Sequence, residues 1–267
     1  MALTVDSSGN VYVADAANNV IRKITPGGTT SFVAGSHSMS TGAGVVAGSN
    51  SNGSQYYFDG LSGITLSPDG NSLYVADIGN RQIVNFRFAN RMFSILTLFE
   101  ISNVPKDSVF GYVPLGNPFG LRFDSKKNLF IVDTYNSRII KIASDNTVSA
   151  LAGGGARDAK GKYQSGYRDG PAADALFNNP TGIAIDNADN IYVADMGNAL
   201  IRKIDTSSNV TTLALEGSAL DPGTNNTGNA GSGGGSSSSG GSGGGGAPSV
   251  LYLFALASLV VARLRRR

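Results

Sequence analysis

The sequence predicts an all-β fold, a β-propeller of four-stranded antiparallel blades, with four blades in the 267-residue chain. One phrase occurs four times: an aromatic residue, two apolar residues, Asp, two variable residues, Asn, two more and Ile. The Asp residues of successive copies are 62, 56 and 62 positions apart, and such a period indicates one repeated supersecondary unit. The first two strand-like runs of each copy are almost entirely apolar, which is typical of sheets packed on both faces, as in propeller blades.

The last copy shows the strands of one blade most clearly. Short apolar runs at 182–186, 191–194, 200–204 and 210–214 alternate with turns of Asn, Asp, Gly and Ser. Runs of this length, rich in β-branched and aromatic residues, predict an antiparallel meander. The other copies follow the same order, with first strands expected at 3–6, 64–67 and 121–124 and fourth strands at 29–33, 93–98 and 147–151.

These residues resemble a known repeat family. The segment from Pro180 to Ile204, with Gly182, Asp195 and Asn198 in place, looks like an NHL repeat, and residues 169–180 resemble the blade-to-blade connection of plant and bacterial NHL proteins. The resemblance covers all four copies, roughly residues 1–216. NHL propellers usually have six blades. Because this chain supplies four and begins inside a first strand, we expect an N-terminal truncation of about two blades; the alternative is an open or self-associating four-blade arc.

Charge and composition exclude some kinds of site. Residues 1–217, the predicted propeller, hold 17 basic and 18 acidic residues, so this part is close to neutral and lacks the excess of positive charge typical of nucleic-acid binding. Arg22-Lys23 and Arg202-Lys203 form basic pairs in two copies only, so the RNA binding known for some NHL propellers is the less favoured function. The chain has no Cys and a single His, which excludes thiol chemistry and any site that needs two or three imidazoles.

The repeated Asp and Asn residues are interpreted as structural turn residues. Each Asp ends a strand, where its carboxylate is expected to accept backbone N–H groups one or two residues on. Each Asn follows three residues later, where tolerance of a left-handed backbone is useful. A feature present in every blade is typical of architecture rather than of one active site. The eight residues are Asp15, Asp77, Asp133, Asp195, Asn18, Asn80, Asn136 and Asn198.

No catalytic, cofactor-binding or metal-binding set stands out, so the sequence favours a non-enzymatic binding scaffold. The alternative is a calcium-dependent hydrolase, because lactonase-like and phosphotriesterase-like propellers resemble this fold and hold calcium with Glu, Asn and Asp. Asp and Asn oxygens could bind calcium, but no spacing indicates a site. Glu occurs only at Glu100 and Glu216. The scaffold prediction therefore includes no cofactor.

The long links between blades are the candidate binding segments. They span 34–60, 99–118 and 152–180, and long loops on a rigid frame often carry binding. Tyr and Arg are frequent interface anchors, so these loops predict contact with a protein or small-molecule partner. The alternative is that the Gly- and Ser-rich loops bind nothing. The candidate residues are Tyr56, Tyr57, Asp59, Tyr163, Tyr167, Arg168 and Asp169.

The C-terminal part predicts a tether. Residues 218–249 are a linker that includes sixteen consecutive Gly and Ser at 231–246, a composition typical of a flexible coil. Residues 250–267 begin with a 13-residue apolar run and end in Arg-Leu-Arg-Arg-Arg. The run is shorter than the roughly 20 residues of a spanning helix, so three interpretations stay open: a short transmembrane helix, a GPI signal, or an end without a role.

A membrane segment at this end would place the propeller outside the cytosol. No signal peptide precedes Met1 in the sequence, which is a second indication of N-terminal truncation. The predicted localisation is therefore a membrane, through one C-terminal segment, with an extracytoplasmic propeller.

Overall fold

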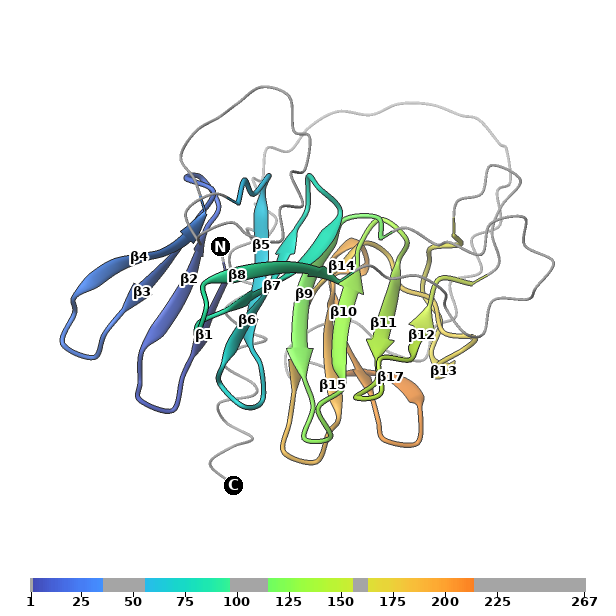
Figure 1. The fold of residues 1–267 in the computed structure, drawn as a ribbon. Coiled ribbons are helices and arrows are strands. Elements are labelled where there is room, and N and C mark those ends of the chain that lie inside the picture. The colour runs from blue at the N-terminus through green and yellow to red at the C-terminus, as the bar shows by residue number, and fades with distance from the viewer. Residues whose placement is uncertain (1, 36–55, 97–114, 156–162, 214–267) are drawn as a thin grey trace, which may run out of the picture.

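The computed structural model describes residues 2–35, 56–96, 115–155 and 163–213, and these fold into four antiparallel sheets that stand side by side as an arc of blades (Figure 1). Blade 1 holds β1 (Ala2–Val5), β2 (Val11–Asp15), β3 (Val20–Ile24) and β4 (Thr30–Gly35). Blade 2 holds β5 (Leu61–Leu66), β6 (Ser72–Asp77), β7 (Gln82–Arg87) and β8 (Met92–Leu96). Blade 3 holds β9 (Pro118–Phe123), β10 (Leu129–Asp133), β11 (Arg138–Ile142) and β12 (Val148–Gly153).

Blade 4 has an additional edge strand. It holds β14 (Pro180–Ile185), β15 (Ile191–Asp195), β16 (Leu200–Ile204) and β17 (Asn209–Leu213), with the short helix η1 (Met196–Asn198) between β15 and β16. β13 (Gly170–Pro171), from the link that precedes this blade, pairs with the outer side of β17. Apart from β13, the strands of every blade follow one another in sequence order, so the predicted meander and the four blades are confirmed.

Short Asp-headed turns join the first two strands in three of the blades. The carboxylates of Asp6, Asp124 and Asp186 each accept backbone N–H groups two and four residues later, over 2.7–2.9 Å. Such side-chain bonds satisfy donors that the strands leave unpaired, and they favour a tight turn. These turns lie at one edge of the arc, and the turns between second and third strands lie at the opposite edge (Figure 1).

Each blade packs its two faces differently. We call the face that turns to the preceding blade the leading face and the other the trailing face. Tyr12, Ala14 and Ile21 on the trailing face of blade 1 pack with Val75 and Phe86 on the leading face of blade 2 in one buried cluster. Two further clusters join blade 2 to blade 3 and blade 3 to blade 4. The predicted burial of both faces is thus confirmed for the interior of the arc.

The leading face of blade 1 is the exception. Leu3, Val5 and Phe32 lie on it and are 52%, 53% and 45% exposed. The corresponding faces of the other three blades are covered by the blade before them, whereas no blade precedes this one within the described residues. An apolar sheet face therefore meets solvent at this end of the arc.

The innermost strands approach one another closely. β1, β5, β9 and β14 lie next to one another in blade order. A Cβ atom placed on Gly63 of β5 would lie 2.0 Å from the carbonyl oxygen of Phe119 on β9, and one on Gly120 would lie 2.8 Å from that of Thr181 on β14. Glycine at these positions lets the backbones of adjacent blades meet.

The predicted tether lies outside the described residues, because neither the 218–249 linker nor the 250–267 segment is among them. Within the described ranges, no helix is long and apolar enough to cross a membrane. The C-terminal hydrophobic helix of the predicted fold therefore stays a prediction.

Candidate functional site

Four turns of the same kind line one edge of the arc, where the second strand of each blade ends. In each turn the side-chain amide of Asn donates a hydrogen bond to the carboxylate of the Asp three residues earlier, at 2.8 Å. We call this region the Asp–Asn edge. Its defining residues are Asp15, Asn18, Asp77, Asn80, Asp133, Asn136, Asp195 and Asn198.

The carboxylates also fasten the incoming links. The backbone N–H groups of Asp59, Gly116 and Asn178 donate to Asp77, Asp133 and Asp195 over 2.7–2.9 Å. These donors lie 17 or 18 residues before the carboxylate rather than one or two residues after it, so the expected local bonds are not the principal ones. The physical reason is that the link enters the blade beside the buried carboxylate, and its N–H needs a partner there.

The left-handed backbone falls one residue later than expected. Positive φ angles of 51–55° occur at Asn19, Arg81, Ser137 and Ala199, each of which follows the repeated Asn. None of the four repeated Asn residues has a positive φ. The expectation for them was wrong because their amides bind the Asp carboxylates, and the next residue makes the reversal into the third strand.

An arginine pairs with the carboxylate in three blades. Arg22 contacts Asp15 at 2.7 Å and Arg138 contacts Asp133 at 2.8 Å; the third pair is Arg202–Asp195, at 2.9 Å. The second and third pairs are almost fully buried, whereas the first is partly exposed. Arg22 and Arg202 are therefore engaged in ion pairs within their blades.

Blade 2 lacks this arginine. Val84 stands at the strand position that Arg22 and Arg202 occupy, and Asp77 is bound by the hydroxyl of Tyr56 at 3.3 Å instead. Burial raises the pKa of Asp77 to about 6, and the hydrogen bonds from Asn80, Asp59 and Tyr56 only partly offset it. Asp77 is thus a buried carboxyl group that no cation among the described residues compensates in the way Arg202 compensates Asp195.

We expect this carboxyl group to make stability depend on pH. Its folded-state pKa lies above the ordinary aspartate value of 3.8, so its contribution to stability is fully present below that value and is lost as the pH rises through about 6. The unfolding free energy of the wild type relative to Asp77→Asn should fall by about 2–3 kcal/mol between about pH 4 and pH 7. Urea unfolding at a series of pH values measures this difference.

Asp69 provides the matched control for that measurement. Hydrogen bonds from Ser67 and Asn71 lower its pKa to about 2, so the stability it contributes is present above pH 3.8 and is lost only as the pH falls through about 2. The difference in unfolding free energy between the wild type and Asp69→Asn should therefore stay constant between about pH 4 and pH 7. A level difference for Asp77→Asn as well would contradict the expectation.

The structure divides the candidate link residues into two groups. Tyr56 is buried and Asp59 lies beside the Asp77 turn, while Tyr163 accepts a hydrogen bond from Arg138 and Asp169 binds Arg202. These four contact their own blades, although Asp59 and Asp169 are also exposed. The other three, Tyr57, Tyr167 and Arg168, are exposed, and the ring of Tyr167 also lies 4.9 Å from the Arg202 guanidinium.

Two exposed residues of the edge were not predicted. Tyr135 and Met196 occupy the variable positions of the Asp–Asn turns in blades 3 and 4. Two link residues lie at the same edge: the Tyr57 carbonyl accepts a hydrogen bond from Asn80, and Tyr167 follows Gly166, whose carbonyl accepts one from Asn198. Together these four large hydrophobic side chains are 37–57% exposed. The sequence signal that could have predicted them was an aromatic residue or Met between the repeated Asp and Asn, which occurs in two of the four copies.

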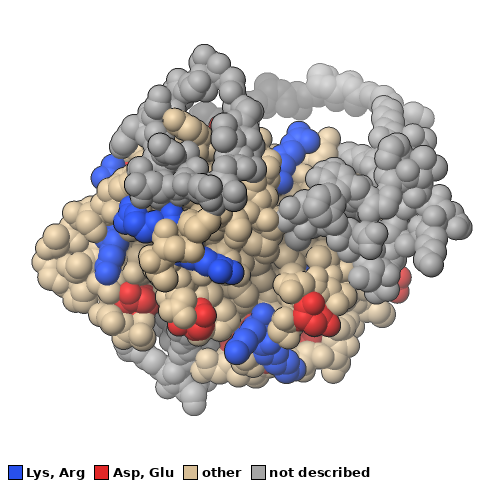
Figure 2. All heavy atoms as spheres, viewed as in Figure 1, with Lys and Arg blue, Asp and Glu red and all other residues tan. Residues whose placement is uncertain are grey.

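The described residues suggest no metal centre. They contain no group of three or more His, Cys, Asp or Glu side chains placed to hold a metal ion. His37, Glu100 and Glu216 lie outside these residues. Figure 2 shows acidic and basic side chains on the same described face. The calcium site and the RNA-binding function considered from the sequence therefore stay untested predictions.

Four meander sheets with adjacent innermost strands and repeated Asp–Asn turns define a β-propeller built from sequence repeats. The family model of the NHL repeat matches residues 177–204. The chain is 30% identical over 170 residues, 58% of its length, to Protein SUPPRESSOR OF QUENCHING 1, chloroplastic, of Arabidopsis thaliana. It is 39% identical over 88 residues, 33% of its length, to NHL repeat-containing protein 2 of Gallus gallus. These matches support the resemblance to NHL-repeat β-propellers that the sequence predicted.

The relatives are much longer than the matched region. The alignments cover 15% of the Arabidopsis protein and 11% of the chicken protein. Among solved structures, a protein of unknown function from Bacteroides thetaiotaomicron VPI-5482 is similar with a TM-score of 0.55 at 19% identity, over 79% of this chain and 46% of that one. This similarity supports the fold alone.

Proposed function

We propose that this protein is a non-enzymatic binding module that presents its Asp–Asn edge and inter-blade links to a protein or small-molecule partner. The observation that supports the proposal is the placement of Tyr57, Tyr135, Tyr167 and Met196, exposed beside turns that hydrogen bonds fasten to the blades. Tyrosine offers a large contact area at a low cost in conformational entropy, and it is enriched among residues that dominate binding energy.

The buried ion pairs support the same proposal. Arg138 and Arg202 are held by carboxylates and by Tyr163 and Asp169, so these groups stiffen the edge. A rigid frame with exposed aromatic side chains loses little freedom when a partner binds. The frame positions the contact residues and takes no part in bond making.

A peptide selection tests this function. Peptides selected from a random displayed library on the full chain are compared for binding to the wild type and to Tyr57→Ser/Tyr135→Ser/Tyr167→Ser. We expect the triple variant to bind at least about tenfold more weakly, because truncating an interface anchor commonly costs more than 1 kcal/mol. The control, Leu3→Ser/Phe32→Ser, changes the leading face of blade 1 and should bind normally. Peptides that bind the triple variant as well as the wild type would contradict the proposal.

The calcium-dependent hydrolase is distinguished by metal content. A purified protein that retains one calcium per chain, measured by mass spectrometry after dialysis, would favour the hydrolase over the binding module. The proposed module is expected to retain less than a stoichiometric amount, because its Asp carboxylates are bound by amide, backbone and guanidinium donors.

The C-terminal tether belongs to the same proposal. We propose that residues 218–249 connect the propeller to a membrane segment within 250–267, which would keep the propeller outside the cytosol. Expression of the full chain and of a chain shortened after residue 246 tests it. The full chain should sediment with membranes after a carbonate wash and the shortened chain should not, because the apolar run supplies the insertion energy. Equal amounts of both in the soluble fraction would contradict the tether.

A further inference from the structure

A cavity of about 270 Å³ opens between blades 2 and 3, at the edge of the arc opposite the Asp–Asn edge. Its volume lies just below the roughly 300–1,000 Å³ typical of sites for drug-sized ligands, so it suits a smaller molecule. The residues that line it come from both blades: Ser67, Pro68, Asp69, Tyr74, Leu96, Phe123, Lys127, Leu129, Ile142, Ala143, Ser144 and Asn146.

Side-chain size at one position distinguishes this blade interface from the one between blades 1 and 2. Between blades 1 and 2, Phe88 packs on Tyr12 with ring centroids 5.4 Å apart, and on Phe86 at 5.9 Å. Ser144 is the counterpart of Phe88 in blade 3, since each stands eleven residues after the Asp of its blade. The hydroxymethyl side chain of Ser144 stands where the benzyl side chain of Phe88 stands in blade 2, which leaves more space between the blades.

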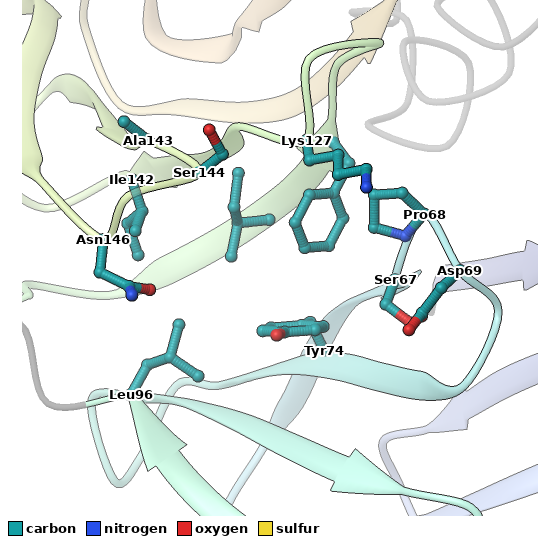
Figure 3. A pocket seen from close by; sticks show the side chains of 12 residues that line it. Ser67, Pro68, Asp69, Tyr74, Leu96, Lys127, Ile142, Ala143, Ser144 and Asn146 are labelled. Atoms are coloured by element: carbon teal, nitrogen blue, oxygen red, sulfur yellow. The ribbon is translucent and has the colours of Figure 1, made fainter.

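Part of the cavity wall is apolar and aromatic. Tyr74 and Phe123 meet edge to face, with centroids 5.1 Å apart and an interplanar angle of 80°. Figure 3 shows Tyr74 and Leu96 of blade 2 on one side of the space and Ile142 of blade 3 on the other. Walls of this kind favour a flat apolar group, because aromatic rings stack on or against the edges of other rings.

The rim carries one charge of each sign. Lys127 reaches across the opening towards Pro68 (Figure 3), and its ammonium has no hydrogen-bond or ion-pair partner among the described residues. Asp69 is on the opposite rim, where Ser67 and Asn71 donate hydrogen bonds to its carboxylate. A ligand with a single charge meets one attractive and one repulsive group, whereas a zwitterion can satisfy both.

We propose that this cavity binds a free aromatic α-amino acid, with the aromatic side chain between Leu96 and Ile142 and against the ring of Tyr74, the carboxylate towards Lys127 and the ammonium towards Asp69. The apolar part of the wall selects the side chain, and the two rim charges select the zwitterionic end. This site is separate from the Asp–Asn edge, so the peptide selection described above does not test it.

L-tryptophan is a suitable probe because the chain contains no tryptophan, and the indole emission then reports the ligand alone. Titration of the full chain into L-tryptophan should give a saturable blue shift, with a dissociation constant of about 0.1–1 mM for a ligand of this size. Methyl NMR of the same mixture should shift the signals of Leu96, Leu129 and Ile142. The absence of a saturable change up to about 5 mM would overturn the proposal.

Two analogues test the zwitterion. Tryptamine lacks the carboxylate and indole-3-propionate lacks the ammonium, so each should bind about threefold to tenfold more weakly than L-tryptophan. Equal binding of all three would show that the rim charges do not select the ligand, and it would overturn the proposed ligand class.

Variants locate the site. Ser144→Phe should fill the cavity and weaken binding at least about tenfold, whereas Thr206→Phe, at the matching position of blade 4, should not. Lys127→Gln should weaken binding of L-tryptophan about threefold to tenfold and leave that of tryptamine unchanged. The control is Lys126→Gln, because Lys126 is an exposed neighbour that does not line the cavity. Thermal melts confirm folding, and normal binding by folded Ser144→Phe or by Lys127→Gln would overturn the assignment.

Discussion

Arg202→Leu is expected to destabilise the propeller by about 3–5 kcal/mol, because it leaves the buried carboxylate of Asp195 without its counter-charge. The guanidinium also donates to the carbonyl oxygens of Leu176 and Arg168 and to Asp169, which ties the third link to blade 4. Loss of one side chain therefore removes a donor from two buried acceptors, the Leu176 carbonyl and the Asp195 carboxylate. The free energy of unfolding from urea titration measures the effect.

Arg22→Leu is the matched control in blade 1. Arg22 occupies the same strand position and pairs with Asp15, but the two side chains are 37% and 21% exposed. Water can solvate the remaining carboxylate, so we expect a loss of at most about 1 kcal/mol. Equal losses for Arg22→Leu and Arg202→Leu would show that burial of the pair does not set its importance.

Gly63→Ala is expected to separate the innermost strands of blades 2 and 3, at a cost of about 3 kcal/mol or more. The new methyl group would lie 2.0 Å from the Phe119 carbonyl oxygen and 2.5 Å from the side chain of Leu121. A backbone atom cannot move aside as a flexible side chain can, so the strain falls on the blade interface. Thermal unfolding and near-UV circular dichroism should both report the loss of packing.

Gly27→Ala separates this steric effect from the general consequence of replacing glycine. A Cβ atom on Gly27 would meet nothing nearer than the Thr25 hydroxyl, at 3.9 Å, so stability should change by less than about 0.5 kcal/mol. If Gly63→Ala unfolded at the same temperature as Gly27→Ala, the close approach of β5 and β9 would not govern the interface.

Much of the fold could be predicted because the repeat carries its own local signals. In the last copy, one strand-like run ends at Asp195, turn residues follow, and the next run starts near Leu200. The same order of runs and turns recurs in each copy of the repeat. Apolar residues at successive positions indicated burial on both faces. β13 was not predicted, because it has two residues and pairs with β17 only through the folded position of the link.

The bonds of the Asp–Asn edge were harder to predict. Local reasoning gives an Asp at a strand end its nearest backbone donors. The donors to Asp133 and Asp195 include Gly116 and Asn178, which folding brings in from the link before each blade. The sequence does not show which link residue donates to which carboxylate, because a short motif does not determine the path of the link.

The exposed tyrosines show a similar limit. Tyr135 stands at a variable position of the repeat, and a single sequence does not show whether a residue there contacts a partner or only completes the turn. Conversely, Tyr163 and Asp169 look like interface residues in a long link, yet they lie against Arg138 and Arg202. Sequence spacing does not reveal which arginine a link residue will meet.

The exposed leading face of blade 1 also sets the order in which the arc opens. Among the described residues, blades 2 and 3 are packed between two blades, whereas blade 1 packs against a blade through its trailing face only and blade 4 through its leading face only. In a repeat array, stability is largely a sum of nearest-neighbour interfaces, so units with one interface open at a lower free energy than units with two. Backbone amides of β2 and β3 therefore exchange their hydrogens sooner than those of β10 and β11, and local unfolding proceeds inward from Leu3 and Phe32.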